Sequence, residues 1–135
     1  NYHDEEAIHP DDILEFARKV LERKLDLVYR FRARFDAKFD RENCELLAKS
    51  GARYVGIGLE CASDRVSELI NKGNELTLEK KTEIIGNFEH AGIPFHNYAI
   101  LGLPGERQEE MYETYLFLSK NVRERDNYTC SPNVF

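Results

Sequence analysis

The stretch Ile100-Leu101-Gly102-Leu103-Pro104-Gly105-Glu106 decides how this chain folds. An apolar run ends there in a glycine- and proline-containing turn, so a strand must stop at the turn and a helix can begin after it. A strand, a glycine turn and a helix start together present open main chain to a ligand at the carboxyl end of the strand. The same residues also fit an ordinary strand-to-helix connection, because short glycine motifs have many chance matches.

The composition is that of one small domain. At 135 residues the chain is long enough for one core and too short for two ordinary domains, so we expect a single unit over residues 1–135. The net charge is -6, and Lys and Arg are interspersed with Asp and Glu, so no nucleic-acid partner is indicated. No apolar run approaches the roughly 20 residues that span a bilayer, so we expect no membrane partner.

The three cysteines, Cys44, Cys61 and Cys130, are odd in number and far apart. This pattern argues against a disulfide framework and favours a reducing compartment, so we expect a cytoplasmic protein. The cysteines also lack the close spacing of a zinc or iron–sulfur motif. We therefore expect each to be a small buried or half-buried residue, and we predict no metal ligand.

The first ten residues are polar and include His3, Asp4, Glu5, Glu6 and His9. Without further ligands at fixed spacing, we expect a solvated entry loop there and no metal site. Pro10 followed by two acids predicts a helix that ends near Lys24. Its apolar residues recur at helical spacing, and they are Ile13, Phe16, Ala17, Val20 and Leu21.

Residues 27–35 alternate as a strand does. One face carries apolar side chains, namely Leu27, Tyr29, Phe31, Ala33 and Phe35, and the other carries Val28, Arg30, Arg32 and Arg34. If helices cover the apolar face, the arginines line the inner face of a sheet, where they need anionic partners or water. An edge strand with a solvated basic face is the alternative.

The segment from Arg53 to Glu60 predicts a second strand with two glycines on one face. A helix capped by Asp40 and ended by Gly51 precedes it. Gly56 and Gly58 share a face with Glu60, and the absence of their side chains leaves space beside a carboxylate where a ligand can lie. A β-bulge or close packing of a helix is the alternative reason for the glycines.

The rest of the chain predicts further helices and strands in alternation. Ser63-Asp64 caps a short helix that carries Val66, Leu69 and Ile70 and ends at Asn71-Lys72-Gly73. The helix from Thr77 to Gly92 buries Ile84, Ile85 and Phe88, and Ile93 to Leu101 forms the third strand. The last helix carries Met111, Tyr115 and Leu118 on one stripe and runs to about Arg125. Residues 127–135 have strand-like side chains, but Pro132 interrupts them, and we expect no partner element there.

A loose repeat connects these units. Helix, glycine, strand and Gly-Leu recur from Gly51 and Gly58-Leu59 to Gly92 and Gly102-Leu103. This spacing fits successive strand–helix units of an α/β sheet, in which the strands are parallel and their carboxyl ends meet at one edge.

Five segments resemble, in order and at similar spacing, the second half of the radical S-adenosylmethionine (SAM) core, especially in the subgroup that often carries a cobalamin-binding domain. The resemblance runs from about Leu27 to Tyr115. The segments are Arg34-Phe35-Asp36, Gly51-Ala52-Arg53-Tyr54-Val55-Gly56-Ile57-Gly58-Leu59-Glu60, Ile70-Asn71-Lys72-Gly73, His90-Ala91-Gly92-Ile93 and Ile100-Leu101-Gly102-Leu103-Pro104-Gly105-Glu106.

This resemblance implies a partial parallel (β/α) barrel, a fragment of a TIM-barrel-like core. It also implies roles for nine residues in holding SAM. Arg34 would pair with the SAM carboxylate, and Glu60 would accept hydrogen bonds from a ribose hydroxyl or the amino group. Gly56 and Gly58 would open space beside the adenine, and the main chain of Ile100, Gly102, Leu103, Pro104 and Gly105 would lie against it. A cross-strand ion pair between Arg34 and Glu60 is the structural alternative.

The family holds a [4Fe-4S] cluster through a Cys-x3-Cys-x2-Cys loop, and its oxidoreductase chemistry begins with reductive cleavage of SAM. This sequence has no such loop, so we expect a fragment that contains no catalytic residue and is inactive alone. Cobalamin is the further cofactor that the subgroup suggests, and its use stays open. A non-catalytic α/β interaction or regulatory domain is the alternative function. Because an open sheet exposes its edges, we expect self-association or marginal stability.

Overall fold

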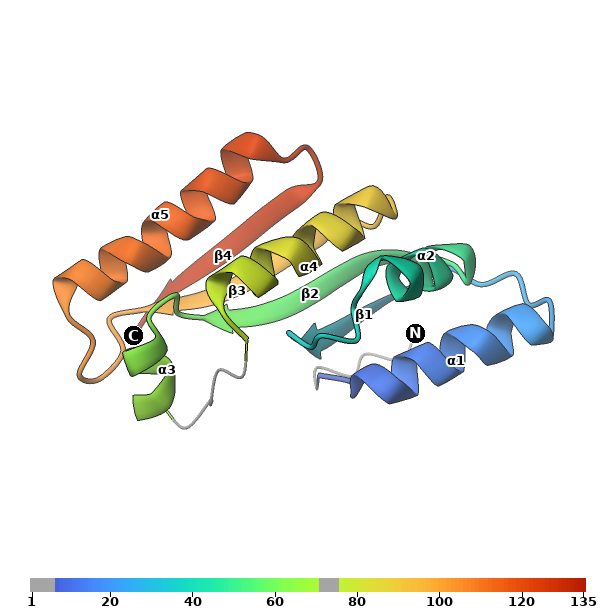
Figure 1. Cartoon of the computed structure of the whole chain (residues 1–135), viewed down its shortest axis with the longest axis horizontal. Coiled ribbons are helices and arrows are strands. Elements are labelled where there is room, and N and C mark those ends of the chain that lie inside the picture. The colour runs from blue at the N-terminus through green and yellow to red at the C-terminus, as the bar shows by residue number, and fades with distance from the viewer. Residues whose placement is uncertain (1–6, 71–75) are drawn as a thin grey trace.

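The computed structural model describes residues 7–70 and 76–135. Strands and helices alternate along nearly all of this length (Figure 1). In chain order the elements are α1 (Pro10–Glu22), β1 (Tyr29–Arg34), α2 (Arg41–Lys49), β2 (Ala52–Glu60), α3 (Asp64–Leu69), α4 (Leu78–His90), β3 (Phe95–Leu101), α5 (Gln108–Glu124) and β4 (Tyr128–Val134).

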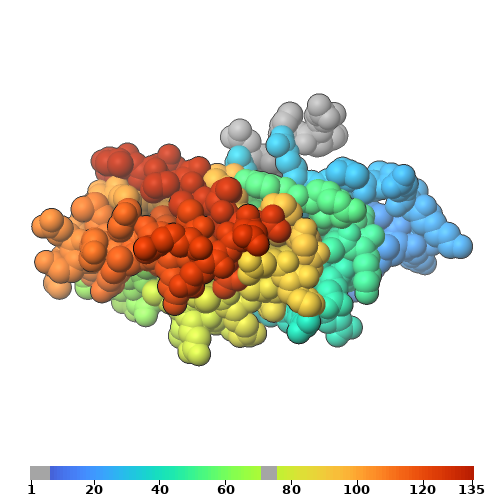
Figure 2. Space-filling view, turned by 90° about the horizontal axis from the view of Figure 1, so that it is seen from above, coloured from blue at the N-terminus to red at the C-terminus, as the bar shows by residue number. Residues whose placement is uncertain are grey.

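The four strands form one sheet in the order β1-β2-β3-β4, and every neighbouring pair is parallel. The predicted α/β class with parallel strands is therefore confirmed. Figure 2 shows the helix layer, with α5 in orange and α4 in yellow, on one side and strand residues such as those of β4 in dark red along the opposite side. The sheet thus has one face under helices and one face without them.

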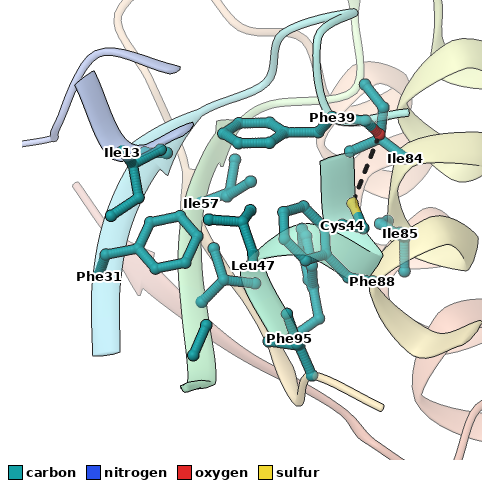
Figure 3. Close-up of a cluster of buried hydrophobic side chains, with 14 of the residues drawn as sticks. Ile13, Phe31, Phe39, Cys44, Leu47, Ile57, Ile84, Ile85, Phe88 and Phe95 are labelled. Atoms are coloured by element: carbon teal, nitrogen blue, oxygen red, sulfur yellow. Dashed lines mark hydrogen bonds between the residues drawn. The ribbon is translucent and has the colours of Figure 1, made fainter. Parts of the chain in front are cut away.

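The main core lies between the sheet and helices α1, α2 and α4 (Figure 3). The ring of Phe88 on α4 is central, because its centroid lies 5.2 Å from that of Phe39 and 5.6 Å from that of Phe95. Leu118 of α5 packs separately on Leu59 and Ala99. The predicted apolar face of β2 is buried, and that of β1 is buried at Phe31 and Ala33, whereas Leu27, which precedes the strand, is exposed. The arginines of β1 point to the open face.

The predicted helix ends are confirmed where local chemistry determines them. Asp40 accepts a hydrogen bond from the Asn43 amide at 2.8 Å, and Ser63 and Thr77 cap α3 and α4 in the same way. Gly51 follows α2 with φ +104° and Gly92 follows α4 with φ +72°, a region that side chains disfavour. A Cβ atom on Gly51 would lie 1.8 Å from the Leu27 carbonyl oxygen, so only glycine fits there.

Strand boundaries are tighter than predicted at two places. β1 begins at Tyr29 and ends at Arg34, within the predicted residues 27–35. β3 begins at Phe95 and not at Ile93, because the Ile93 amide donates to the Phe88 carbonyl at the end of α4. In α1, Leu14 is buried, whereas Phe16 and Leu21 of the predicted stripe are exposed.

Two predictions for the carboxyl-terminal part were wrong. Residues 128–134 form a strand that pairs with β3 through Pro132, which lies opposite Ala99. Because β4 is an edge strand, it tolerates a residue that cannot donate a ladder hydrogen bond. In α5 the buried stripe is Glu110, Thr114, Leu118 and Asn121, whereas Tyr115 is 55% exposed. The three buried polar side chains of this stripe all form hydrogen bonds within the protein.

The expected entry loop at His3 to Glu6 and the predicted helix end at Asn71-Lys72-Gly73 lie outside the described residues. Within the described part of the chain, no helix is both long and apolar enough to cross a membrane.

Candidate functional site

The carboxyl ends of β1, β2 and β3 lie at one edge of the sheet, which we call the rim. Arg34 is the last residue of β1, and its partner across the ladder is Gly58, two residues before Glu60. Gly102 follows the last residue of β3. Because adjacent strands are about 4.8 Å apart, parallel pairing brings these three residues to the same end of neighbouring strands, as predicted.

Glu60 has an unusual backbone at the rim. Its φ is +62°, and the ladder between β2 and β3 shifts register between Gly58 and Glu60. A β-bulge was one of the alternative reasons for the glycines in this strand, and the register shift fits a bulge beside Gly58 but does not involve Gly56. Left-handed backbone is disfavoured for a residue with a side chain, and such conformations cluster at ligand sites. Within the described residues there is no ion pair between Arg34 and Glu60.

The space beside the two glycines of β2 is taken by side chains of the chain itself. A Cβ atom on Gly56 would lie 2.8 Å from the ring of Tyr98, which rests on this glycine from β3. A Cβ atom on Gly58 would lie 3.0 Å from the Glu60 carboxylate. Gly56 therefore makes room for an aromatic ring and Gly58 for the rim carboxylate, and a cofactor-binding role of either glycine stays a prediction.

The turn after β3 is held by the side chain of Glu106. Its Oε2 accepts hydrogen bonds from the amides of Gly102 at 2.6 Å and Leu103 at 3.0 Å. Gly102 and Gly105 have φ of +80° and +83°, so both need glycine. Oε1 of the same carboxylate is buried, and no described residue donates a hydrogen bond to it. The predicted open main chain is thus partly occupied, and one buried acceptor remains.

The other turn residues differ in exposure. Leu103 is buried and packs on Cys61 and Val66, and Ile100 lies against the same cluster. Gly102, Pro104 and Gly105 are exposed. The turn therefore has an apolar anchor below and accessible main chain above.

A partly buried ion pair between Arg65 and Glu110 connects the turn to α3, just after β2. The guanidinium of Arg65 on α3 donates to Oε1 of Glu110 at 2.6 Å and to Oε2 at 2.5 Å. It also donates to the Gly105 carbonyl at 2.8 Å. Ser63 donates to the same carboxylate at 3.2 Å, and the hydroxyl of Thr114 accepts from the Ala62 amide at 2.9 Å.

These contacts explain the polar stripe of α5 and fix the state of Glu110. Its pKa is lowered to about 2, chiefly by the hydrogen bond from Arg65 and then by the amide of Arg107. A carboxylate with such a low pKa is ionised throughout the physiological range. At neutral pH Glu110 is therefore charged, and its ion pair with Arg65 joins α3, α5 and the turn at Gly105.

The open face of the sheet carries a second polar group of residues below the rim. The guanidinium of Arg32 lies 5.2 Å from the centre of the Tyr98 ring. His96 contacts the Tyr98 ring edge-on, with centroids 4.5 Å apart, and its Nδ1 lies 2.7 Å from the hydroxyl of Thr129. Burial, followed by a hydrogen bond with Tyr98, raises the pKa of Tyr54 to about 12.

The cysteines do not form a metal site. Cys44 and Cys61 are buried, and burial raises the pKa of both thiols, that of Cys44 to about 12. Iron–sulfur clusters need thiolates, which this burial disfavours. No group of three or more His, Cys, Asp or Glu residues within the described ranges could hold a metal ion. The described residues therefore do not fit a [4Fe-4S] cluster.

Four residues whose side chains hold the rim together were not predicted from the sequence, and they are Arg65, Glu106, Glu110 and Thr114. Glu106 lies inside the quoted turn, and an acid just after a Gly-Pro turn signals a side chain that can cap free amides. The spacing from Arg107 to Glu110 is that of a helix cap and its third residue, where Glu returns to the cap amide, and that bond is 2.8 Å long. Arg65 and Thr114 carry no comparable local signal, because their partners are more than 40 residues away in sequence.

Comparisons with known proteins agree with the resemblance. The family described as the Radical SAM superfamily matches residues 4–118. The anaerobic magnesium-protoporphyrin IX monomethyl ester cyclase of Rubrivivax gelatinosus is 29% identical over 113 residues, which are 83% of this chain and 20% of that protein. The cytidylyl-2-hydroxyethylphosphonate methyltransferase of Streptomyces wedmorensis is 35% identical over 85 residues, covering 58% of this chain and 16% of that protein.

Solved structures share the fold. The radical SAM methyltransferase TsrM of Kitasatospora setae, with tryptophan and a SAM analogue bound, has a TM-score of 0.68 at 19% identity, over 87% of this chain and 24% of that chain. The cobalamin-dependent SAM radical enzyme OxsB, with aqua-cobalamin bound, has a TM-score of 0.60 at 20% identity, over 81% of this chain and 16% of that chain. The chain spans a quarter or less of these relatives, and its fold matches part of a radical SAM core.

Proposed function

Because this chain belongs to the radical SAM superfamily, we propose that its rim forms part of a SAM-binding site. The observation that carries the proposal is the meeting of Arg34, Glu60 and the glycine turn at one end of three parallel strands. Ligands of parallel α/β sheets bind at this end. SAM has a carboxylate that can pair with the guanidinium, and an amino group and ribose hydroxyls that can donate to the carboxylate. Its flat adenine can lie against the accessible main chain.

In this proposal the two charged residues recognise the charged end and the sugar of SAM. Arg34 is exposed at the rim and offers a planar donor fork, which suits a carboxylate. Glu60 accepts from the amino group or a ribose hydroxyl, and its left-handed backbone and the bulge beside it orient the side chain. Gly58 contributes by leaving room for that carboxylate.

The turn contacts the adenine in this proposal. Gly102 is open, because a Cβ atom there would meet only the Phe135 carbonyl oxygen at 3.9 Å. Its amide already binds Glu106, so the turn would use Cα atoms and carbonyl groups against the flat ring. Ile100, Leu103, Pro104 and Gly105 complete the surface.

Proteins of this family use SAM with a [4Fe-4S] cluster, and the solved neighbours bind cobalamin. When bound, SAM supplies either a methyl group or a 5′-deoxyadenosyl radical. The described residues do not fit the cluster, so we propose that the cluster ligands of the active protein belong to another segment. The residues described here would bind and orient SAM, and use of cobalamin is a proposal from the relatives alone.

Direct titration with SAM tests this proposal, by calorimetry, in this chain or in a longer polypeptide that carries it. Glu60→Gln removes the charge that attracts the amino group, and we expect the dissociation constant to rise about ten-fold. Arg34→Ala is expected to act similarly through the carboxylate. Glu22→Gln, an exposed acid on α1, is the matched control and should change nothing. Unaltered SAM affinity in Glu60→Gln and Arg34→Ala would remove both roles.

A non-catalytic interaction domain is the second candidate, and one observation favours it. A groove of about 450 Å³ beside α5 is lined mainly by apolar atoms of Leu101, Met111, Tyr112 and Tyr115. Exposed apolar surface of this kind marks interaction sites. SAM binding that depends on Glu60 would favour the first candidate, whereas absence of any SAM binding would favour the second.

A further inference from the structure

The open face of the sheet bears positive charge although the chain as a whole is acidic. Arg30, Arg32 and Arg34 project from β1 onto this face, and the net charge of the chain is -6. Among the charged residues of the four strands, the only acid that shares this face is Glu60, at the rim. The described strand residues therefore place more positive than negative charge on this face, and no described helix covers it.

Three rings form the floor of this face beside Arg32. The Tyr98 ring lies on Gly56, where there is no side chain in its way. A Cβ atom on Gly56 would lie only 2.8 Å from this ring. His96 stands edge-on to Tyr98, and its ring lies 6.2 Å from that of Tyr54 at an angle of 31°. All three rings are half-buried, so each keeps an exposed part. Flat rings held in this way offer stacking surface at low entropic cost.

Arg32 is placed to bind an anion above these rings. Its guanidinium lies over the Tyr98 ring, 5.2 Å from the ring centre, and the residue is exposed. No described carboxylate forms an ion pair with it. A guanidinium beside an aromatic ring makes a cation–π contact, and it can still pair with a carboxylate through its N–H fork. Burial and the charge of Arg32 lower the pKa of His96, so this ring is neutral at physiological pH and adds a hydrogen-bonding group without repelling the guanidinium.

We propose that Arg32 and the rings of Tyr54, His96 and Tyr98 bind a planar conjugated molecule that carries a carboxylate. The carboxylate pairs with the fork of Arg32, and the ring system lies over the aromatic floor. This site is separate from Arg34 and lies below the rim on the same face. The idea that the bound molecule is a substrate rests on the proposed function, since the molecule would then face SAM at the rim. The idea that the site binds such a molecule does not depend on SAM.

The test uses naphthoate, a planar aromatic carboxylate whose own fluorescence reports binding. The chain contains no tryptophan, so the ligand signal has little protein background. We expect saturable binding that Arg32→Met weakens about ten-fold or more, because a charge-assisted bidentate contact is lost. Arg18→Met on α1, which is exposed, is the matched control and should bind as the unaltered chain does.

Two ligand controls and one further variant separate this site from the rim. Naphthylmethanol keeps the ring without the charge, and cyclohexanecarboxylate keeps the charge without the flat ring; both should bind more weakly. Arg34→Met removes a charge of the same face without the contact to the carboxylate, so it should weaken naphthoate binding far less than Arg32→Met does. Arg32→Met should leave SAM binding intact. The proposal is overturned by absent saturable binding, by equal affinity in Arg32→Met, or by an equal loss in Arg34→Met. Failure of SAM binding alone would remove the proposed rim and leave this site standing.

Discussion

Replacing Glu106 by alanine removes the carboxylate that holds the turn after β3. Two amides, those of Gly102 and Leu103, then lose an acceptor at 2.6 and 3.0 Å. Hydrogen bonds to charged groups contribute about 1.5–3 kcal/mol each, and water replaces part of this at an exposed turn, so the free energy of unfolding should fall by about 1.5–3 kcal/mol in total. For a chain of 135 residues, this loss lowers Tm by about 5–10 °C.

Two measurements check this expectation. Thermal unfolding followed by circular dichroism gives the change in Tm. Amide hydrogen exchange is more specific, since a local loss of about 1.4 kcal/mol should speed exchange of the Gly102 and Leu103 amides about ten-fold. Glu106→Gln keeps one acceptor oxygen and should give smaller changes of the same sign.

Glu109→Ala is the matched control, because Glu109 is an exposed acid three residues further along, in the first turn of α5. This substitution removes only the attraction between the Glu109 carboxylate and the helix dipole, so the free energy of unfolding should fall by about 0.3–1 kcal/mol. If Glu106→Ala matches Glu109→Ala in Tm and in exchange at Gly102, the carboxylate does not hold the turn and this account of the rim fails.

Three further predictions concern the fold. Gly92→Ala should lower the free energy of unfolding by about 1–2 kcal/mol because of its left-handed backbone alone, since a Cβ atom there meets nothing within 4 Å. Gly51→Ala should cost about 1–3 kcal/mol more, because its Cβ atom would also meet the Leu27 carbonyl. Equal losses in chemical denaturation would contradict this difference. The depressed pKa of Glu110 stabilises the fold above its ordinary value of 4.5, and this stabilisation should be lost as the pH falls toward about 2; Glu110→Gln should flatten that part of a Tm-against-pH curve, and an unchanged curve would oppose the ion pair as its cause. The chain should self-associate at high concentration through its uncovered sheet face or edges, and sedimentation of a stable monomer would count against this.

Local signals made most of the fold predictable. Capping residues such as Asp40 and Thr77 accept a hydrogen bond from the amide three residues later in the chain. The alternation of apolar and charged residues in β1 predicts which face of the strand is buried. Once the strands are parallel, the meeting of Arg34, Glu60 and Gly102 at one edge follows from topology. These features need no knowledge of distant contacts.

What could not be predicted depends on contacts between distant segments. Hydrophobic periodicity assigns polar residues to solvent, so it placed Met111 and Tyr115 on the buried stripe of α5 instead of Glu110 and Thr114. Those two residues are buried because the loop after β2 supplies their partners, about 50 residues earlier in the chain. Likewise, Gly56 indicated an empty space because the sequence does not reveal that Tyr98 fills it from the neighbouring strand.

Two charged side chains near the rim form hydrogen bonds to the main chain of the same turn, one at each end. Glu106 holds its beginning through the amides of Gly102 and Leu103, and Arg65 holds its end through the carbonyl of Gly105. Gly102, Pro104 and Gly105 of this turn are exposed, so a ligand would meet a backbone whose shape is set before it binds. Preorganisation of this kind lowers the entropic cost of binding. Because the planar guanidinium of Arg65 binds Glu110 and the turn together, a lysine there could not make the same set of contacts, and the turn would lose its connection to α3.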